Sequence, residues 1–352
     1  VKMLLDHRGY KIKHEFIRGI ITVEKNYSYK NFEAFLSDCK TEKKYSVYKK
    51  ALNILKQSPH LKNRLNLNLA EKKISLSSKG YPTNVFEKNS LRSNELIEMT
   101  MILSNLCVSQ TLSQSITKYL SRYHEIPDKH ALKDLNIFTS LNDLATIRGK
   151  QVTSNSFNEI LKQCKYPDKK ELLSNFILRI LPKAKYSDVE AGHFGLNLPL
   201  YCHFTSPIRR YADLTVHRSL AFALKWEMDD LNFMKDHKAI CKIINESEKK
   251  SVGAERESLD RYSALFMSKH IDDYFDGIVS GSSRSCIFIK LKKFPIEGVL
   301  LKKYLVSKNE KKRSSFKYGK SKARDKGLST GDEVRVKLVS VLPYNGSITF
   351  SL

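Results

Sequence analysis

Apolar residues recur at helical spacing over most of the first 272 residues and alternate with polar residues after that point. Within the first part, two alternating stretches, residues 1–23 and 65–87, predict β-hairpins with turns at Gly9 and Gly80. The chain therefore has both helical and strand content. Helices are predicted over the periodic stretches at about 24–56, 96–106, 130–146, 153–165, 169–181, 207–220 and 232–270.

The period changes to alternation at Tyr274, and five short alternating stretches follow with glycine-containing turns between them. Five such strands are typical of a small Greek-key barrel. We therefore predict an α+β protein with a larger domain over residues 1–272 and a five-stranded barrel over residues 273–352. The predicted strands are 275–281, 285–289, 296–299, 331–338 and 346–352.

A helix start is predicted in the polar part of the stretch 193–220. The hydroxyl of Thr205 or Ser206 can accept a hydrogen bond from the unpaired N–H groups of a first helical turn. Pro207 suits the first helical position because it has no N–H to lose. We therefore expect the helix to begin at Ser206-Pro207.

Arg209 and Arg210 would then lie in the first turn of this helix, where the helix dipole and the free N–H groups favour an anion. Two guanidinium groups at such an end can bind a phosphate through paired hydrogen bonds. Asp213 follows Arg209 by four residues, so it can orient Arg209 through an ion pair on the same helix face. Ordinary ion pairs on a helix surface explain the same spacing equally well, and the pattern alone leaves both interpretations open.

The charge balance favours a polyanionic partner. The 352 residues include 62 Lys and Arg against 37 Asp and Glu, which gives a net charge of +25. A general lysine-rich composition explains the same excess, so charge supports nucleic-acid binding only modestly. The hydrophobic content of 41% is ample for globular cores, and no apolar run approaches the length of a membrane span.

The six cysteines are scattered along the chain and form no C-x-x-C pair. This distribution favours free thiols in a reducing cytosol, and hence a cytoplasmic protein, over a zinc site or a disulfide framework. The chain begins directly with strand-like residues and no targeting segment. Because a lone two-stranded hairpin is marginal, we expect that partner strands are missing.

A basic, serine-rich loop is predicted between the third and fourth barrel strands. Its lysines and arginines are interleaved with aromatic residues, which offers phosphate attraction together with base stacking. A solvated lysine loop is about equally compatible with the pattern. The candidate RNA-binding residues in this loop are Lys302, Lys303, Lys312 and Arg313.

One stretch, from His193 to Arg218, resembles the late signature of the ribonuclease II and ribonuclease R family of processive 3′-to-5′ exoribonucleases. Residues 122–127 and 254–257 are also similar to parts of that family. The resemblance implies the second half of an RNB-type catalytic domain, a mixed sheet with packed helices, followed by a barrel similar to the OB-fold RNA-binding module of the first small-subunit ribosomal protein. The central motif reads His203-Phe204-Thr205-Ser206-Pro207-Ile208-Arg209-Arg210-Tyr211-Ala212-Asp213.

The resemblance implies roles for the residues of this motif and for one tyrosine. Arg209 would neutralise charge that develops on the scissile phosphate, and Arg210 with Ser206 would support the grip on the RNA backbone. Tyr29, just before a predicted helical run, would bring its ring close to the 3′ end of the RNA. A tyrosine packed on the core explains the position of Tyr29 about equally well.

Two further residues are expected to contact RNA from the same resemblance. Glu98 is the only carboxylate in an apolar helical run, so we expect it to be buried and to meet an arginine, a substrate hydroxyl or water. In the family the matching helix lies near the terminal nucleotide, although Met99 and Thr100 replace the commoner second acid. Phe288, in the second barrel strand, is the expected RNA contact of the barrel.

The resemblance also implies Mg²⁺, because phosphodiester hydrolysis usually needs a metal held by clustered carboxylates. The family's aspartate cluster would lie upstream of the first hairpin, so we assign no metal ligand in this chain. The acidic groups at residues 227–230 and 272–276 are interpreted as solvated charge. His193, His203 and His217 match no compact zinc spacing, and we expect structural roles for them.

Two functions remain open. The first is a truncated ribonuclease R-like exoribonuclease chain that hydrolyses single-stranded RNA with carboxylates supplied by an N-terminal part or by a separate chain. The second is a catalytically silent RNA-binding remnant, or half of a split enzyme. Single-stranded RNA is the expected partner in both cases, and neither a membrane nor specificity for DNA is expected.

Overall fold

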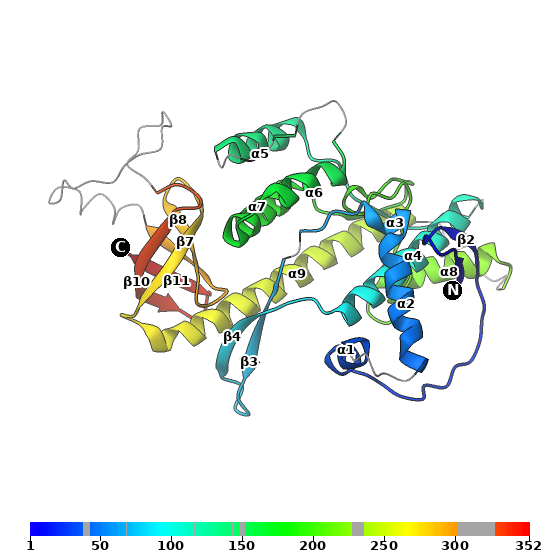
Figure 1. Ribbon diagram of the computed structural model, residues 1–352, viewed down its shortest axis with the longest axis horizontal. Helices are drawn as coiled ribbons and strands as arrows, with labels where there is room; N and C mark the ends of the chain where they lie inside the picture. Colours follow the sequence, from blue (N-terminus) through cyan, green and yellow to red (C-terminus); the bar gives the residue numbers. More distant parts are fainter. Residues whose placement is uncertain are drawn as a thin grey trace. The chain divides into compact units, whose positions relative to one another are not determined.

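The computed structural model divides into two compact units (Figure 1). Unit 1 contains residues 1–69 and 90–248, and unit 2 contains residues 70–89 and 249–352. The α+β class expected from the sequence is confirmed. The structure describes residues 1–37, 43–67, 69–115, 117–141, 144, 146–147, 152–226, 236–301 and 328–352.

Unit 1 is mainly helical, with short two-stranded sheets. Among the described residues, its strands pair only in twos, β1 with β2 and β5 with β6, each antiparallel. Its elements are β1 (Lys2–Leu5), β2 (Lys11–Glu15), α1 (Tyr29–Ser37), α2 (Lys43–Gln57), α3 (Pro59–Lys62), α4 (Arg92–Ser113), β5 (Ser121–Tyr123), α5 (Lys129–Leu141), α6 (Ser154–Gln163), α7 (Pro167–Ile180), β6 (Lys185–Ser187), the 3₁₀ turn η1 (Phe194–Leu196), α8 (Tyr211–Ala223) and the first part of α9 (His237–Met267).

The first hairpin is confirmed, but it is shorter than predicted. Its turn depends on Gly9, which has φ +78°, and a Cβ there would lie 2.6 Å from the carbonyl oxygen of Ile54. Strand β2 ends at Glu15, and residues 16–28 form no regular element. The helix predicted from residue 24 begins instead at Tyr29, because the Ser28 hydroxyl accepts the N–H of Asn31 and caps the first turn.

The helix α4 is the centre of unit 1 because it is apolar around most of its circumference. Leu96, Leu103 and Leu106 pack into one buried cluster with residues of α2, whereas Val108 and Leu112 pack into a second cluster with residues of α8. A helix with this pattern is stable only when other elements cover it on several sides. Its packing therefore fixes the position of the segment that leads into α8.

The helices α5, α6 and α7 form a third packed group, in agreement with the three helices predicted for this region (Figure 1). Leu135, Phe157 and Leu173 are fully buried in its core. A cavity of about 570 Å³ opens beside α5 and is lined by residues between Lys129 and Val152. None of the residues predicted to bind RNA lines this cavity.

Unit 2 is a closed five-stranded barrel with an added hairpin. The strand order is β10-β11-β9-β8-β7, and all pairs are antiparallel except β9 with β11. The five predicted barrel strands and the second predicted hairpin are confirmed. The elements are β3 (Glu71–Leu76), β4 (Pro82–Lys88), the second part of α9, the 3₁₀ turn η3 (Ser268–His270), β7 (Tyr274–Ser282), β8 (Cys286–Leu291), β9 (Glu297–Leu301), β10 (Glu333–Leu342) and β11 (Ser347–Ser351).

The hairpin β3–β4 and the end of α9 share one core with the barrel. Val85 of β4 and Met267 of α9 are buried in the same cluster as Ile289 and Phe350 of the barrel. Lys72 also pairs with Asp260 of α9 at 3.1 Å. The residues of unit 2 therefore fold together although they come from two separate parts of the chain. No described helix is long and apolar enough to cross a membrane.

Substitution of Gly298 by alanine should destabilise the barrel. A Cβ at Gly298 would lie 2.5 Å from the ring of the buried Phe350 and 2.9 Å from the carbonyl oxygen of Ile348. Overpacking of this kind costs about 1–3 kcal/mol. In the control Gly253→Ala, on α9, no atom of a described residue lies within 4 Å of the added Cβ. That control should leave stability unchanged or raise it by about 0.5–1 kcal/mol.

The measurement is the free energy of unfolding of the full chain from urea titrations followed by circular dichroism. A Gly298→Ala protein that is as stable as the Gly253→Ala protein would contradict the packing described for the barrel.

Candidate functional site

The motif at residues 203–213 forms a tight turn followed by helix α8. The predicted helix start at Ser206-Pro207 is wrong: α8 begins at Tyr211, and Arg210 is its N-cap with extended backbone (φ −121°, ψ 116°). The carbonyl oxygen of Ser206 accepts the N–H groups of Arg209 (3.3 Å) and Arg210 (3.1 Å), which closes the turn. The side chain that holds this turn is the carboxylate of Asp213, because it accepts the N–H of Ser206 at 2.8 Å. The Ser206 hydroxyl is therefore not the cap that the sequence predicted.

Asp213 is fully buried and is bound to Arg210. Its Oδ1 atom accepts a hydrogen bond from Arg210 Nη2 at 2.8 Å. The predicted pair between Asp213 and Arg209 is therefore wrong. The backbone at Arg210 is extended, and the side chain of Arg210, three positions before Asp213, points toward the carboxylate instead. A buried carboxylate without a partner would be strongly destabilising. The ion pair with Arg210 and the Ser206 N–H supply compensation at Oδ1, whereas Oδ2 has no hydrogen-bond partner among the described residues.

Arg209 is exposed, in contrast to its neighbour. No described residue forms an ion pair or hydrogen bond with its guanidinium group, so its donors remain available to an external group. The adjacent Ile208 is 98% exposed, and Tyr211 is exposed as well. The rigid turn therefore presents a cation between an aliphatic and an aromatic side chain.

The segment before the turn is fixed by a buried amide that the sequence analysis did not single out. Asn105 of α4 donates from Nδ2 to the hydroxyl of Tyr201 at 2.9 Å and accepts the N–H of Phe204 at 2.9 Å. His217 of α8 lies 2.9 Å from the carbonyl oxygen of Phe204, and the rings of His217 and Phe204 stack at 4.0 Å. In the sequence, the only feature that pointed to a role for Asn105 was the presence of an amide side chain inside an apolar helical run.

A row of packed rings, two of them buried and two half-buried, continues from this segment into the protein. Tyr186 Oη lies 2.8 Å from His203 Nδ1, and the ring of Tyr201 lies 5.7 Å from that of His203 and 5.4 Å from that of His193. Burial, followed by the charge of Arg210, lowers the pKa of His203 from 6.5 to about 2. Burial also lowers the pKa of His193 to about 3. Both histidines are therefore neutral at physiological pH.

The three histidines have structural roles, as expected from the sequence. His193 Nδ1 accepts the N–H of Leu196 at 3.2 Å, and His203 and His217 make the contacts described above. Burial raises the pKa of Tyr186 and that of Tyr201 to about 12, so these hydroxyls also remain protonated. The row is a neutral hydrogen-bonded support and not a set of titrating groups.

A second arginine lies near the same histidine. Arg122 of β5 donates to both carboxylate oxygens of Glu248 at 2.8 and 3.0 Å, and its guanidinium carbon lies 4.5 Å from the ring centroid of Tyr186. Asn245 of α9 accepts the backbone N–H of Tyr186 and donates to its carbonyl oxygen. These contacts give Arg122 a structural role.

Tyr29 and Glu98 lie at the other end of α4. Tyr29 is the first residue of α1 and its side chain is exposed, while its carbonyl oxygen accepts the hydroxyl of Ser93 at 2.8 Å. Glu98 is exposed, so the predicted burial is wrong, because the neighbouring Met99 takes the core position. The expected arginine contact is present: Arg64 Nε lies 3.7 Å from the Glu98 carboxylate.

The predicted site residues therefore fall into separate groups. Ser206, Arg209 and Arg210 lie in one turn, and Tyr29 and Glu98 lie on α1 and α4 of the same unit. Phe288 belongs to unit 2, where it points outward from β8 between the buried Ile287 and Ile289 and is half-buried. The basic-loop candidates Lys302, Lys303, Lys312 and Arg313 lie outside the described residues.

The described residues do not fit a magnesium site. Within the part of the chain that the structure describes, no three His, Cys, Asp or Glu side chains are grouped to hold a metal ion. Asp272 is paired with Lys337 at 2.7 Å and Asp273 with His270 at 3.0 Å. The other acidic group, Glu227, Asp229 and Asp230, lies outside the described residues.

The comparisons with known proteins agree with this arrangement of elements. A family model described as the RNB domain matches residues 1–225. The chain is similar to ribonuclease R of Buchnera aphidicola (28% identity, 100% of this chain, 50% of the relative) and of Aquifex aeolicus (26%, 100% and 51%). It therefore spans about half the length of the curated relatives that it matches.

A solved structure, Mycoplasma genitalium RNase R in complex with ribose methylated single-stranded RNA, has a TM-score of 0.87 with this chain. The two sequences are 23% identical, and the match covers 99% of this chain and 56% of that one. At this identity the likeness shows the fold.

The neutral, half-buried His203 predicts a pH dependence of stability. The unfolded chain titrates this histidine near 6.5, whereas the folded pKa is about 2, so between these values the unfolded state binds more protons. The stabilising contribution is complete above pH 6.5 and is lost as the pH falls. From pH 7.5 to pH 5 this histidine alone should lower the free energy of unfolding by about 2 kcal/mol.

Urea titrations at the two pH values test this with a pair of variants. His203→Asn should reduce the pH-dependent loss by about 2 kcal/mol relative to the unmodified chain. His130→Asn, at an exposed position, should leave the loss unchanged. An undiminished loss in His203→Asn would show that His203 is not held neutral.

Proposed function

Because the chain belongs to the RNB family, we propose that it forms the RNA-gripping part of a ribonuclease R-like 3′-to-5′ exoribonuclease that acts on single-stranded RNA. The observation that carries this proposal is the pair of neighbouring arginines with opposite environments: Arg210 bound to the buried Asp213, and Arg209 exposed on the turn that this pair fixes. The single-stranded RNA bound to Mycoplasma genitalium RNase R supports the choice of polymer.

Arg209 is proposed to bind the phosphate at which the RNA is cut. Its guanidinium offers up to five N–H donors in a rigid fork, which suits two oxygens of one phosphodiester. Preorganised donors of this kind stabilise charge that develops in a transition state more than charge in the ground state. Arg210 and Ser206 then support the backbone grip, Arg210 through its ion pair and Ser206 through its N–H bond to Asp213.

The last nucleotides are proposed to lie against exposed side chains of α1 and α4. The ring of Tyr29 is exposed and available for stacking on a base, and the Glu98 carboxylate can accept a hydrogen bond from a ribose hydroxyl. Residues 1–272 would form the part of the catalytic domain that does this. Residues 273–352 would bind the RNA further from its end, with Phe288 as the stacking residue.

Hydrolysis itself requires groups beyond these. Mg²⁺ is expected for the family, but the described residues do not fit such a site, so we derive no step through a metal. The chain's own contribution is to bind the RNA, to orient it and to neutralise phosphate charge. The carboxylates would come from polypeptide beyond the described residues.

A second candidate function is a catalytically silent RNA-binding protein. The lack of a metal-holding group among the described side chains favours it. Incubation of the pure chain with end-labelled single-stranded RNA and Mg²⁺ distinguishes the two: shortening of the RNA from its 3′ end would exclude a silent protein. Salt-sensitive RNA binding without any shortening of the RNA would favour the silent RNA-binding function for the chain alone.

Arg209→Ala tests the role proposed for Arg209. The active background is a chimera in which this chain replaces the matched half of Aquifex aeolicus ribonuclease R. In this chimera the substitution should lower the turnover number about 10²–10³-fold, because one preorganised donor group is lost. RNA affinity should change by less than about threefold, since many other phosphate contacts remain. Single-turnover rates and fluorescence anisotropy measure the two quantities.

Arg218→Ala, an exposed arginine of α8, is the matched control and should leave turnover unchanged. Equal turnover of the Arg209→Ala and Arg218→Ala chimeras would exclude the role assigned to Arg209.

The basic loop is proposed to add phosphate contacts. Replacing Lys302, Lys303, Lys312 and Arg313 by serine in the full chain should weaken RNA binding and make it less sensitive to salt, because fewer counterions are released. A loss of four phosphate contacts would lower the slope of log Kd against log salt by roughly 3. Fluorescence anisotropy titrations at salt concentrations between about 50 and about 300 mM measure this slope. An unchanged slope would mean that the loop is only a solvated charged segment.

A further inference from the structure

The N-cap residue of helix α4 cannot cap it. This residue is Leu91, whose aliphatic side chain has no acceptor for the unpaired N–H groups of the first turn. The N–H of Ser93, the second residue of the helix, is accepted instead by the carboxylate of Glu33 at 2.8 Å. The helix dipole also favours a carboxylate at this end. Glu33, which belongs to α1, therefore caps α4 from a different helix.

A second interaction strengthens this cap. Arg92 donates from Nε to the same carboxylate at 2.7 Å and from Nη2 to the hydroxyl of Ser37. Burial alone would raise the pKa of Glu33, but the hydrogen bonds from Arg92 and from the Ser93 N–H outweigh burial and lower the pKa. Glu33 is therefore ionised at physiological pH and keeps its charge for both partners.

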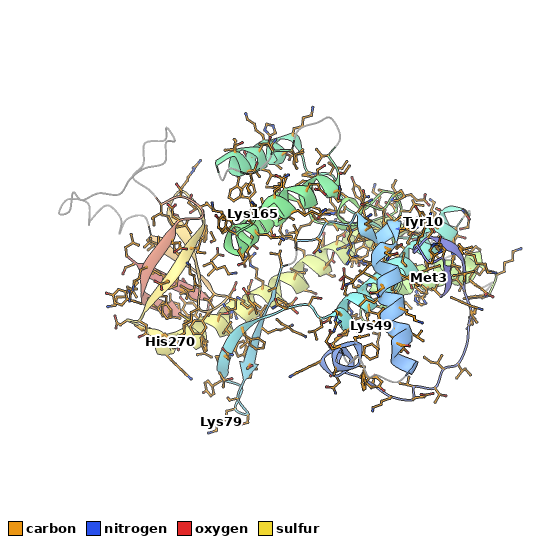
Figure 2. All side chains as sticks on the ribbon, in the orientation of Figure 1. Met3, Tyr10, Lys49, Lys79, Lys165 and His270 are labelled. Atoms are coloured by element: carbon orange, nitrogen blue, oxygen red, sulfur yellow. The ribbon has the colours of Figure 1, made fainter. Side chains whose placement is uncertain are left out.

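The contacts lie along one face of α1. Tyr29 and Glu33 are four residues apart, and so are Glu33 and Ser37, which places all three on the same side of the helix. The carbonyl oxygen of Tyr29 accepts the hydroxyl of the buried Ser93 at 2.8 Å. Helix α1 thus lies beside the start of α4 (Figure 1 and Figure 2), and this face binds the first two residues of α4.

Apolar packing alone does little to orient α1. Leu36 is the only residue of α1 that is fully buried, while Phe32 packs at the edge of the cluster around α4. A helix of nine residues is not stable by itself and depends on tertiary contacts. The polar face that contacts α4 therefore sets the direction of the exposed ring of Tyr29, at the first position of α1.

We propose that Glu33 is a positioning residue for the end of the RNA: by capping α4 from α1, it holds the ring of Tyr29 in the place where the last bases stack. This inference rests on the base contact given to Tyr29 under the proposed function. Glu33 acts through α1, because loss of its carboxylate releases the first turn of α1 from α4. A contribution to stability alone is the alternative, and the two roles have different effects on RNA binding.

Binding of single-stranded RNA to the full chain, without divalent metal, tests the proposal. We define the end-base preference as the Kd for an RNA whose last nucleotides lack their bases, divided by the Kd for the same RNA with every base. Because stacking on an aromatic ring contributes about fivefold or more per base, Tyr29→Ala should lower this preference at least about fivefold. Glu33→Ala should lower it at least about threefold, as measured by fluorescence anisotropy.

A double variant separates positioning from a general effect. Adding Glu33→Ala to Tyr29→Ala should not lower the end-base preference further, because the ring that Glu33 positions is already absent. Glu33→Gln keeps an acceptor for the Ser93 N–H and should retain more of the preference than Glu33→Ala. In the chain without RNA, amides of residues 29–37 should exchange hydrogen faster in Glu33→Ala than in the unmodified chain.

Thr153→Ala is the matched control because it removes the cap of another helix. The hydroxyl of Thr153 accepts the N–H of Ser156 at the start of α6, which carries none of the residues proposed to contact RNA. Thr153→Ala and Glu33→Ala should both lower the melting temperature, since each loses a helix cap. Only Glu33→Ala should lower the end-base preference.

Several results would overturn the inference alone. They are an unchanged end-base preference in Glu33→Ala when Tyr29→Ala loses it, an equal loss in Thr153→Ala, a further loss in the double variant, or unchanged hydrogen exchange in α1. A Tyr29→Ala chain that keeps the preference, or an unmodified chain that lacks it, would overturn the base contact of Tyr29 and this inference with it. The role of Arg209 is tested separately and does not depend on these outcomes.

Discussion

The conformation of the motif at residues 203–213 depends on one buried carboxylate. Asp213 has no exposure to solvent, and a charge in that position must be compensated inside the protein. Arg210 Nη2 and the Ser206 N–H do this at 2.8 Å each. Asp213 also lies in the first turn of α8, where the helix dipole favours an acid. Together with the bonds that the Ser206 carbonyl oxygen accepts from Arg209 and Arg210, these interactions hold the turn between Ser206 and Arg210.

The same constraint separates two chemically identical neighbours. Arg210 has to face the carboxylate, and because its backbone is extended, the side chain before it is directed elsewhere. Arg209 consequently keeps its hydrogen-bond donors for an external anion. The support behind the turn adds no competing charge, since burial keeps His203 and His193 neutral. A rigid turn with a single unpaired guanidinium matches the single negative charge of one phosphodiester.

The sequence was sufficient for the elements whose periodicity is strong. The five barrel strands, the two hairpins and the helices α5 to α7 are each stabilised mainly by burial of their own apolar face. The start of α8 was not predictable in this way, because a contact between Ser206 and Asp213, seven residues apart, overrides a good local cap. Asn105 binds Phe204, nearly one hundred residues later, and no local pattern reports such a pair. Glu98 is exposed because a helix can place one residue outward within a buried run. Tertiary packing sets side-chain partners of this kind.

The acids near the site already have partners, and this limits what the described residues can do. Asp213 binds Arg210, Glu248 binds Arg122, and the Glu33 carboxylate binds both Arg92 and the Ser93 N–H. A carboxylate engaged in this way would have to give up its cation before it could bind a divalent metal, and for the buried Asp213 that exchange would also release the turn that presents Arg209. The acids that shape this turn are therefore unsuited to binding a catalytic metal. Under the proposed function, cations and neutral rings of the described residues would hold the RNA strand, and the groups that activate water would belong to polypeptide beyond the described residues.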